Sequence, residues 1–254
     1  MAASDQFIDT MPERGYDEVL APAYDAWLPP GTVFADDEVY LGAIRRAGGA
    51  ALELGTGNGR FLVPARQQGL DVEGLESSPH MLARCRAHLA AAGLDAVLHE
   101  GTMAPLALPR RYAAIVCPAG SFGLVVHNPL AALRSYLAHL EPGGVLAFSG
   151  SGDVPGATTG FQWRLRRSGT DEATGLTYVT HEAIGSDDTA TQVHLVFNRL
   201  EVYDAAGGLQ DTWFRRMRLR CWPAAEIQVA LRAAGFAEVQ VHGGDDGWVA
   251  LATA

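Results

Sequence analysis

Three glycines at alternate positions, Gly55, Gly57 and Gly59, follow a short apolar segment that carries one acid, Glu53. Glycine reaches positive φ and lets a ligand approach the backbone where a Cβ would block it. The apolar residues after the glycines are typical of a helix, whose free N–H groups would point into the turn. This strand–turn–helix unit predicts a site for a nucleotide-like ligand.

The spacing of the glycines separates two kinds of nucleotide site. In the dinucleotide pattern G-x-G-x-x-G the third glycine would fall at position 60, which is Arg60. A second acid, Glu76, ends the next predicted strand, where a carboxylate can bind a ribose diol. The sequence therefore disfavours an oxidoreductase with a nicotinamide cofactor, and it favours another ligand that contains a ribose.

Alternating strands and helices position these groups. Strands are expected over five short stretches: 50–54, 71–76, 96–99, 112–117 and 145–148. Helices are expected at about 35–46, 59–68, 78–92 and 129–140. Ser78 as N-cap and Pro79 at the first helical position are strong start signals for the third of these helices. Strands alternating with helices predict a doubly wound, mostly parallel sheet.

The pattern changes in the second half of the chain, from about position 161 to position 220. Apolar and polar residues alternate there over four stretches: 177–181, 192–198, 199–203 and 211–220. Residues 204–208 form a hairpin turn signal. A helix at 223–234 and strands near 236–242 and 247–253 then return to the first sheet. The segment 16–28 precedes all of this, and Pro22 is expected to kink or split any helix in it.

Four motifs in this order resemble those of the class I S-adenosylmethionine-dependent methyltransferases. The turn is similar to the first motif of that family, and residues 74–82 (G-L-E-S-S-P-H-M-L) are similar to its G-x-D/E-x-S-x-x-M-L segment. Residues 137–144 end in the L-x-P-G-G of the family, and residues 231–236 match its L-x-x-A-G-F. The resemblance implies S-adenosyl-L-methionine as the cofactor, with Glu76 accepting from both ribose hydroxyls and Met81 lying against the adenine.

The resemblance also implies a full set of cofactor contacts. Residues 101–103 stand where the family has G-D-M, with Thr102 in the place of the aspartate, and the tip of the fourth strand holds the methionine part of the cofactor. The implied cofactor-binding residues are Tyr24, Glu53, Gly55, Thr56, Gly57, Asn58, Gly59, Glu76, Ser77, Met81, Gly101, Thr102, Met103 and Cys117.

A closer resemblance is to the small-molecule methyltransferases that act on amino sugars and related natural products. These carry a late antiparallel insert and two N-terminal tyrosines, which Tyr16 and Tyr24 match in spacing. Members that act on nucleotide-linked amino sugars have a histidine at the position of Leu124, and the nearest histidine here is His127. The expected catalytic residues are Tyr16 and His127. The alternatives are that Tyr16 and Tyr24 only pack the N-terminal lid and that His127, beside Asn128 and Pro129, is a solvated side chain or a cap.

The acceptor is expected to enter beside the fourth strand, against Ser121 and Phe122 as substrate-binding residues. His181 and His194 lie on strands of the insert and face either the acceptor or the other side. Arginines alternate along two insert strands: Arg164 and Arg166 on one, and Arg216, Arg218 and Arg220 on the other. They either cover solvated sheet faces or bind a carboxylate or phosphate of the acceptor.

The predicted fold class is α/β: a Rossmann-like, doubly wound, mostly parallel seven-stranded sheet with a small antiparallel β insert of three or four strands and an N-terminal helical lid. The expected division is a lid (1–48), a cofactor-binding α/β domain (49–150 and 221–254) and an insert that roofs the acceptor site (151–220). The expected activity is methyl transfer to oxygen or nitrogen of a small natural-product-like acceptor. The alternative is a non-methylating cyclase or binding module on the same fold.

Composition narrows the partners. A net charge of −10 repels phosphate backbones and argues against nucleic acid. No apolar run is long enough for a bilayer, and the start of the chain lacks a signal-peptide pattern, so a cytoplasmic protein without a membrane partner is expected. The three cysteines have no metal-ligand spacing, and no metal is expected. The sequence leaves open whether the protein forms a homodimer.

Overall fold

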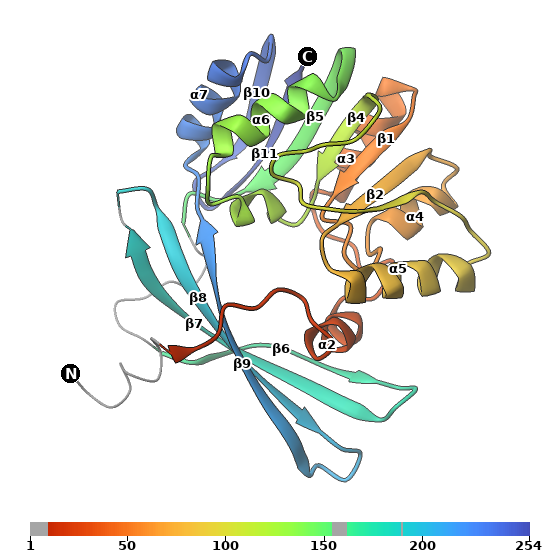
Figure 1. Cartoon of the computed structure of the whole chain (residues 1–254), viewed down its shortest axis with the longest axis vertical. Coiled ribbons are helices and arrows are strands. Elements are labelled where there is room, and N and C mark those ends of the chain that lie inside the picture. The colour runs from red at the N-terminus through yellow and green to blue at the C-terminus, as the bar shows by residue number, and fades with distance from the viewer. Residues whose placement is uncertain (1–9, 154–161, 189) are drawn as a thin grey trace.

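The α/β part of the molecule is a seven-stranded sheet built from both halves of the chain (Figure 1). The computed structural model describes residues 10–153, 162–188 and 190–254, so the first nine residues of the expected lid lie outside the described residues. The sheet has the order β10-β11-β5-β4-β1-β2-β3. Its strands are β1 (Ala51–Leu54), β2 (Val72–Glu76), β3 (Leu98–Glu100), β4 (Tyr112–Cys117), β5 (Leu140–Gly150), β10 (Glu238–Gly244) and β11 (Gly247–Thr253).

The directions of these strands match the predicted sheet. Strands β1 to β5 pair in parallel, and β11 and β10 pair antiparallel at one edge. The predicted fold class is confirmed.

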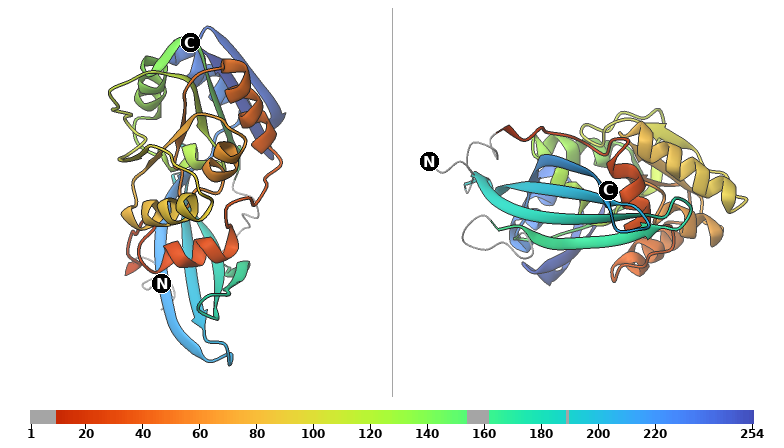
Figure 2. Two further views of the ribbon diagram at one scale, coloured as in Figure 1. Left: turned by 90° about the vertical axis from the view of Figure 1, so that its right-hand side faces the viewer. Right: turned by 90° about the horizontal axis from the view of Figure 1, so that it is seen from below.

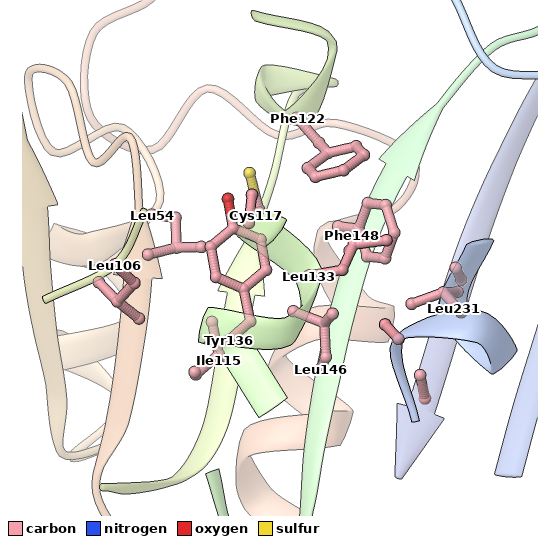
Figure 3. Packing of buried hydrophobic residues seen from close by; sticks show 14 of the residues in the cluster. Leu54, Leu106, Ile115, Cys117, Phe122, Leu133, Tyr136, Leu146, Phe148 and Leu231 are labelled. Atoms are coloured by element: carbon pink, nitrogen blue, oxygen red, sulfur yellow. The ribbon is translucent and has the colours of Figure 1, made fainter. Parts of the chain in front are cut away.

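Helices cover both faces of this sheet. They are α3 (Asp37–Ala47), α4 (Leu62–Gln67), α5 (Pro79–Ala91), α6 (Pro129–Ala138) and α7 (Ala224–Ala234). Successive residues of a strand point to opposite faces. In β4, Ala114 and Val116 therefore pack with α3, α4 and α5, whereas Ile115 and Cys117 pack with α6 and α7 (Figure 3). Burial on both faces explains why the sequence of β4 is a continuous apolar run.

Two helix starts show how local signals act. The Ser78 hydroxyl accepts a hydrogen bond from the Met81 N–H at 3.2 Å, which is the predicted N-cap of α5. The helix after the glycine turn begins at Leu62, about one turn later than predicted. All three glycines of the turn have positive φ, which the right-handed helix excludes.

The insert is a separate antiparallel sheet with the order β6-β7-β8-β9. Its strands are β6 (Arg164–Asp171), β7 (Leu176–Asp188), β8 (Val193–Tyr203) and β9 (Leu209–Arg220). The stretches predicted at 192–198 and 199–203 are one strand, β8, and the strand indicated by the alternating Arg164 and Arg166 is β6. In β8, Val196, Phe197 and Asn198 are all buried, so neither face shows a clean alternation.

The N-terminal helix α2 (Leu20–Trp27) packs between the insert and α5 (Figures 1 and 2). The Trp27 indole donates to the Tyr178 carbonyl of β7 at 3.0 Å. The prediction that Pro22 would kink or split this helix is wrong, because Pro22 is in its first turn, where its missing N–H has no helical partner. No helix in the described part of the chain is long and apolar enough to cross a membrane.

Candidate functional site

A cleft of 210 Å³ opens at the carboxyl ends of β1, β2 and β3, and we call it the glycine-turn cleft. Its main-sheet wall includes Leu75 and seven of the predicted cofactor-binding residues: Gly55, Gly57, Glu76, Ser77, Met81, Gly101 and Met103. A Cβ at Gly55 would lie 3.3 Å from the Met103 Cε, and one at Gly57 would lie 3.3 Å from the Met81 Cε. The turn therefore leaves an open space beside the two methionines, and side chains at Gly55 and Gly57 would fill that space.

Glu76 is held in this cleft by backbone donors. Its Oε1 accepts hydrogen bonds from the N–H groups of Ser77 and Ser78, both at 2.8 Å, and its Oε2 accepts from the Gly57 N–H at 3.0 Å. These bonds link the glycine turn to the end of β2 and orient the carboxylate, and no Lys, Arg or His of the described residues forms an ion pair with it. A fixed carboxylate beside two apolar thioether side chains fits a ribose next to a flat aromatic base.

Several predicted cofactor residues lie outside the cleft. Glu53 is buried under the turn, where it accepts from the Thr56 hydroxyl at 2.7 Å, and burial raises its pKa to about 8. Thr102 is exposed and bonds to the Ala104 backbone. Cys117 is buried in the core, and burial raises the pKa of its thiol to about 12 (Figure 3).

Two further residues of the turn that were predicted to contact the cofactor, Asn58 and Gly59, also face away from the cleft. The Asn58 side chain is fully buried and bonds to Asp25 and Leu28. Gly59 faces α5, where a Cβ would lie 2.9 Å from the Cys85 Sγ. Sequence spacing alone does not distinguish glycines that face a ligand from one that faces a helix.

A larger cavity of 430 Å³ lies between the main sheet and the insert, and we call it the inter-sheet cavity. The two hollows share six lining residues: Tyr16, Tyr24, Ser121, Leu124, Arg215 and Met217. The rings of Tyr16 and Tyr24 meet edge to face, with centroids 5.5 Å apart. Burial and the nearby Tyr16 raise the pKa of Tyr24 far above its ordinary range, so its hydroxyl stays neutral.

The predicted histidines do not lie in these walls. His127 is exposed and lines neither hollow. His181 and His194 are partly buried, and they also line neither hollow. Phe122 lines the inter-sheet cavity and packs on Phe148, with centroids 5.0 Å apart (Figure 3). In the described residues, no group of three or more His, Cys, Asp or Glu could hold a metal ion.

The insert supplies polar groups that sequence reasoning missed. Glu182, Asn198 and Arg215 form one row across β7, β8 and β9, in register, on the face toward the cavity. The Arg215 Nε donates to the Asn198 Oδ1 at 2.9 Å, and its guanidinium lies 4.9 Å from the ring centre of Tyr16. The available signal was alternation along each strand, which does not reveal which face is covered.

Arg166, Arg167 and Arg220 also line the cavity. Among the described residues, Arg167 and Arg220 have no carboxylate within 4 Å, and the buried Arg220 Nε has no hydrogen-bond partner. Burial lowers the pKa of both guanidinium groups, and Arg166 adds to the effect at Arg167. Of the other arginines predicted to alternate, Arg216 and Arg218 pair instead with a single glutamate outside the cavity.

A Rossmann-like sheet with this glycine turn and a fixed carboxylate at the next strand end is typical of proteins that bind a nucleotide-like ligand. Comparison with known proteins identifies the family. The family described as "Methyltransferase domain" matches residues 51–144. The dTDP-3-amino-3,6-dideoxy-alpha-D-glucopyranose N,N-dimethyltransferase of Streptomyces fradiae is 30% identical over 192 residues, which cover 72% of each chain.

Solved structures agree in fold. The CcbJ methyltransferase of Streptomyces caelestis superposes with a TM-score of 0.71 at 22% identity, covering 91% of this chain and 94% of that one. SAM-bound CalS10, an amino pentose methyltransferase of Micromonospora echinaspora, superposes with a TM-score of 0.65 at 26% identity and covers 94% and 98%.

The chain belongs to the class I S-adenosylmethionine-dependent methyltransferases of the amino-sugar and natural-product type. It is an enzyme that uses S-adenosyl-L-methionine to methylate a small acceptor. The prediction of a methyltransferase is confirmed.

Proposed function

We propose that the enzyme methylates an amine nitrogen on a small, sugar-like acceptor that carries an anionic group. The glycine-turn cleft would hold the cofactor, with Glu76 at the ribose and Met81 and Met103 at the adenine. The inter-sheet cavity would hold the acceptor. S-adenosylmethionine, when bound, supplies an electrophilic methyl group, and the chain must orient a nucleophile toward it in a dry site.

The observation that favours methylation of nitrogen over methylation of oxygen is the set of residues where the glycine-turn cleft meets the inter-sheet cavity. Among the six described residues that line both, none is a histidine, aspartate or glutamate. Tyr24 stays protonated, and Arg215 has no lone pair to accept a proton. A hydroxyl acceptor needs a base to become a good nucleophile, whereas a neutral amine already has its lone pair. A junction without a base therefore favours an amine.

The arginines of the inter-sheet cavity support two further parts of the proposal. Positive charge near an amine lowers the amine's pKa and so favours its neutral, nucleophilic form. The unpaired guanidinium groups of Arg167 and Arg220 could each bind a carboxylate or phosphate of the acceptor. The related enzyme from Streptomyces fradiae is named for a dTDP-linked amino sugar, which has both an amine and phosphates.

Glu182 would take the proton that leaves the methylated nitrogen. It lies in the cavity wall, and among the described residues the Arg166 Nε, at 3.6 Å, is the one cation within 4 Å of it, so no close bidentate pair neutralises its carboxylate. Tyr16 would help orient the amine, since its ring is fixed between Tyr24 and Arg215.

The test is turnover of dTDP-3-amino-3,6-dideoxy-α-D-glucopyranose beside its 3-hydroxy analogue, followed by mass spectrometry. We expect one or two methyl groups on the amine and none on the analogue. Arg167→Gln and Arg220→Gln should each raise the KM of the amine about tenfold or more, because each removes a charge-assisted contact. Equal methylation of both compounds would refute the nitrogen assignment. An unchanged KM in both arginine variants would refute the anion contact.

A further inference from the structure

Two residues of the glycine turn, Asn58 and Arg60, make contacts that a cofactor-binding turn does not require. Their side chains are buried, and neither lines the glycine-turn cleft or the inter-sheet cavity. Both instead contact the segment 28–37, which joins the lid helix α2 to α3. The turn therefore has a second face, directed away from the cleft.

Both N–H groups of the Asn58 amide are used on this second face. Its Nδ2 donates to the Leu28 carbonyl and to the Asp25 Oδ1, both at 2.8 Å. Its Oδ1 accepts from the Arg60 N–H at 3.2 Å. Since an amide has two N–H donors, Asn58 has none left for a cofactor.

Arg60 binds the same segment more extensively. Its Nη1 and Nη2 form a forked pair with Asp37 at 2.7 and 3.0 Å, and Nη1 also donates to the Thr32 carbonyl at 2.8 Å. Its guanidinium lies 4.0 Å from the ring centre of Phe34. The Arg60 carbonyl accepts from the Gly31 N–H at 3.3 Å. A planar guanidinium can form the forked pair, the bond to the carbonyl and the stack on the ring at the same time, whereas a lysine ammonium cannot.

The segment held in this way forms a wall of the inter-sheet cavity. Leu28 and Phe34 both line that cavity, as do Tyr24 and Trp27 just before them. The Phe34 N–H donates to the same Asp37 oxygen that Arg60 binds, at 2.7 Å, so one carboxylate fixes both the arginine and the cavity-lining residue.

We propose that Asn58 and Arg60 are positioning residues for acceptor recognition: they hold the Leu28–Phe34 wall of the inter-sheet cavity from the cofactor turn and contribute little to cofactor affinity. The inference rests on the proposed function in one respect, namely that the inter-sheet cavity holds the acceptor. The expected consequence is a variant that binds cofactor normally and recognises its acceptor poorly.

Arg60→Lys is the primary test variant, because it keeps the charge and loses the fork and the stack. Arg66→Lys is its matched control: Arg66 lies on α4, bonds to Asp71 at 2.9 Å and lines neither hollow. Asp37→Asn removes the same fork from the other partner and serves if Arg60→Lys does not fold.

Three measurements are made on each full-length variant: the Kd of S-adenosylmethionine by calorimetry, amide hydrogen exchange over 28–37, and the KM of dTDP-3-amino-3,6-dideoxy-α-D-glucopyranose. For Arg60→Lys we expect a cofactor Kd within about threefold of wild type, exchange about tenfold faster over 28–37 but not over 51–57, and a KM about tenfold higher. Arg66→Lys should match wild type in all three.

A cofactor Kd that rises as much as the KM would overturn the proposal, and so would unchanged exchange over 28–37. If the wild-type enzyme does not methylate the amino sugar, the proposed function has failed on that substrate. The exchange and calorimetry results then still decide whether Arg60 holds the cavity wall, since neither measurement needs an acceptor.

Discussion

Replacing Glu76 with glutamine tests the cofactor site most directly. In the wild type, Oε1 accepts two backbone N–H groups and Oε2 accepts the Gly57 N–H at 3.0 Å. The glutamine amide has one acceptor oxygen, which would stay with the Ser77 and Ser78 N–H groups. Its NH₂ group would then face the Gly57 N–H, donor against donor, and could not accept from a ribose hydroxyl.

The expected loss of affinity is that of one hydrogen bond from a ribose hydroxyl to a charged carboxylate. Such a bond contributes about 2 kcal/mol, which corresponds to about thirtyfold in a dissociation constant. We therefore expect Glu76→Gln to raise the Kd of S-adenosylmethionine about thirtyfold, measured by isothermal titration calorimetry at constant pH and salt.

Glu100→Gln is the control for the charge change. Glu100 pairs with Glu76 in the register of β2 and β3, but it is exposed and does not line the cleft. Its removal should alter the Kd by less than about twofold, because exposed charges are screened by solvent and salt. A folded Glu76→Gln enzyme with wild-type affinity would refute the assignment of the carboxylate to the cofactor.

Two further predictions concern the turn itself. Gly59→Ala should lower the free energy of unfolding by about 3 kcal/mol in urea denaturation, because φ is +89° and the new Cβ would lie 2.9 Å from the Cys85 Sγ. Adding Cys85→Ala should recover part of the loss, and full additivity would contradict the contact. Burial raises the pKa of Glu53 from 4.5 to about 8, so the folded state binds the proton more tightly and stability falls as pH rises from about 4.5 to 8. Glu53→Gln, which can still accept from Thr56, should flatten the dependence of Tm on pH in that window, and an unchanged slope would contradict the assignment.

The central strand β4 was predictable because both of its faces are buried, which leaves a continuous apolar run in the sequence. The residues 112–117 form β4 as predicted, and Ser78 caps α5 as predicted. The insert was harder, since β8 is buried on parts of both faces and reads as two stretches. Alternation locates a strand but does not say which side another layer covers.

The resemblance of the motifs identified the cofactor, but it did not show which residues of the glycine turn face the cofactor. Gly57 and Asn58 are neighbours, yet Gly57 lines the cleft and the Asn58 side chain points to the lid. His127 was predicted from its proximity in sequence to the fourth strand, and the structure leaves it exposed. Side-chain direction depends on the backbone torsions of the turn and on what packs behind it, and the spacing of residue types contains neither.

The sequence by itself determined the fold class and the methyl donor, because both depend on local order along the chain: strand, glycine turn, helix and an acid at the next strand end. Only the tertiary structure decided what surrounds the acceptor. The walls of the inter-sheet cavity come from α2 and the segments on either side of it, the segment 119–124 after β4, the end of β5, the insert, and the β10–β11 turn with the start of β11. These segments are far apart in sequence, so their meeting is set by how the two sheets and α2 pack together.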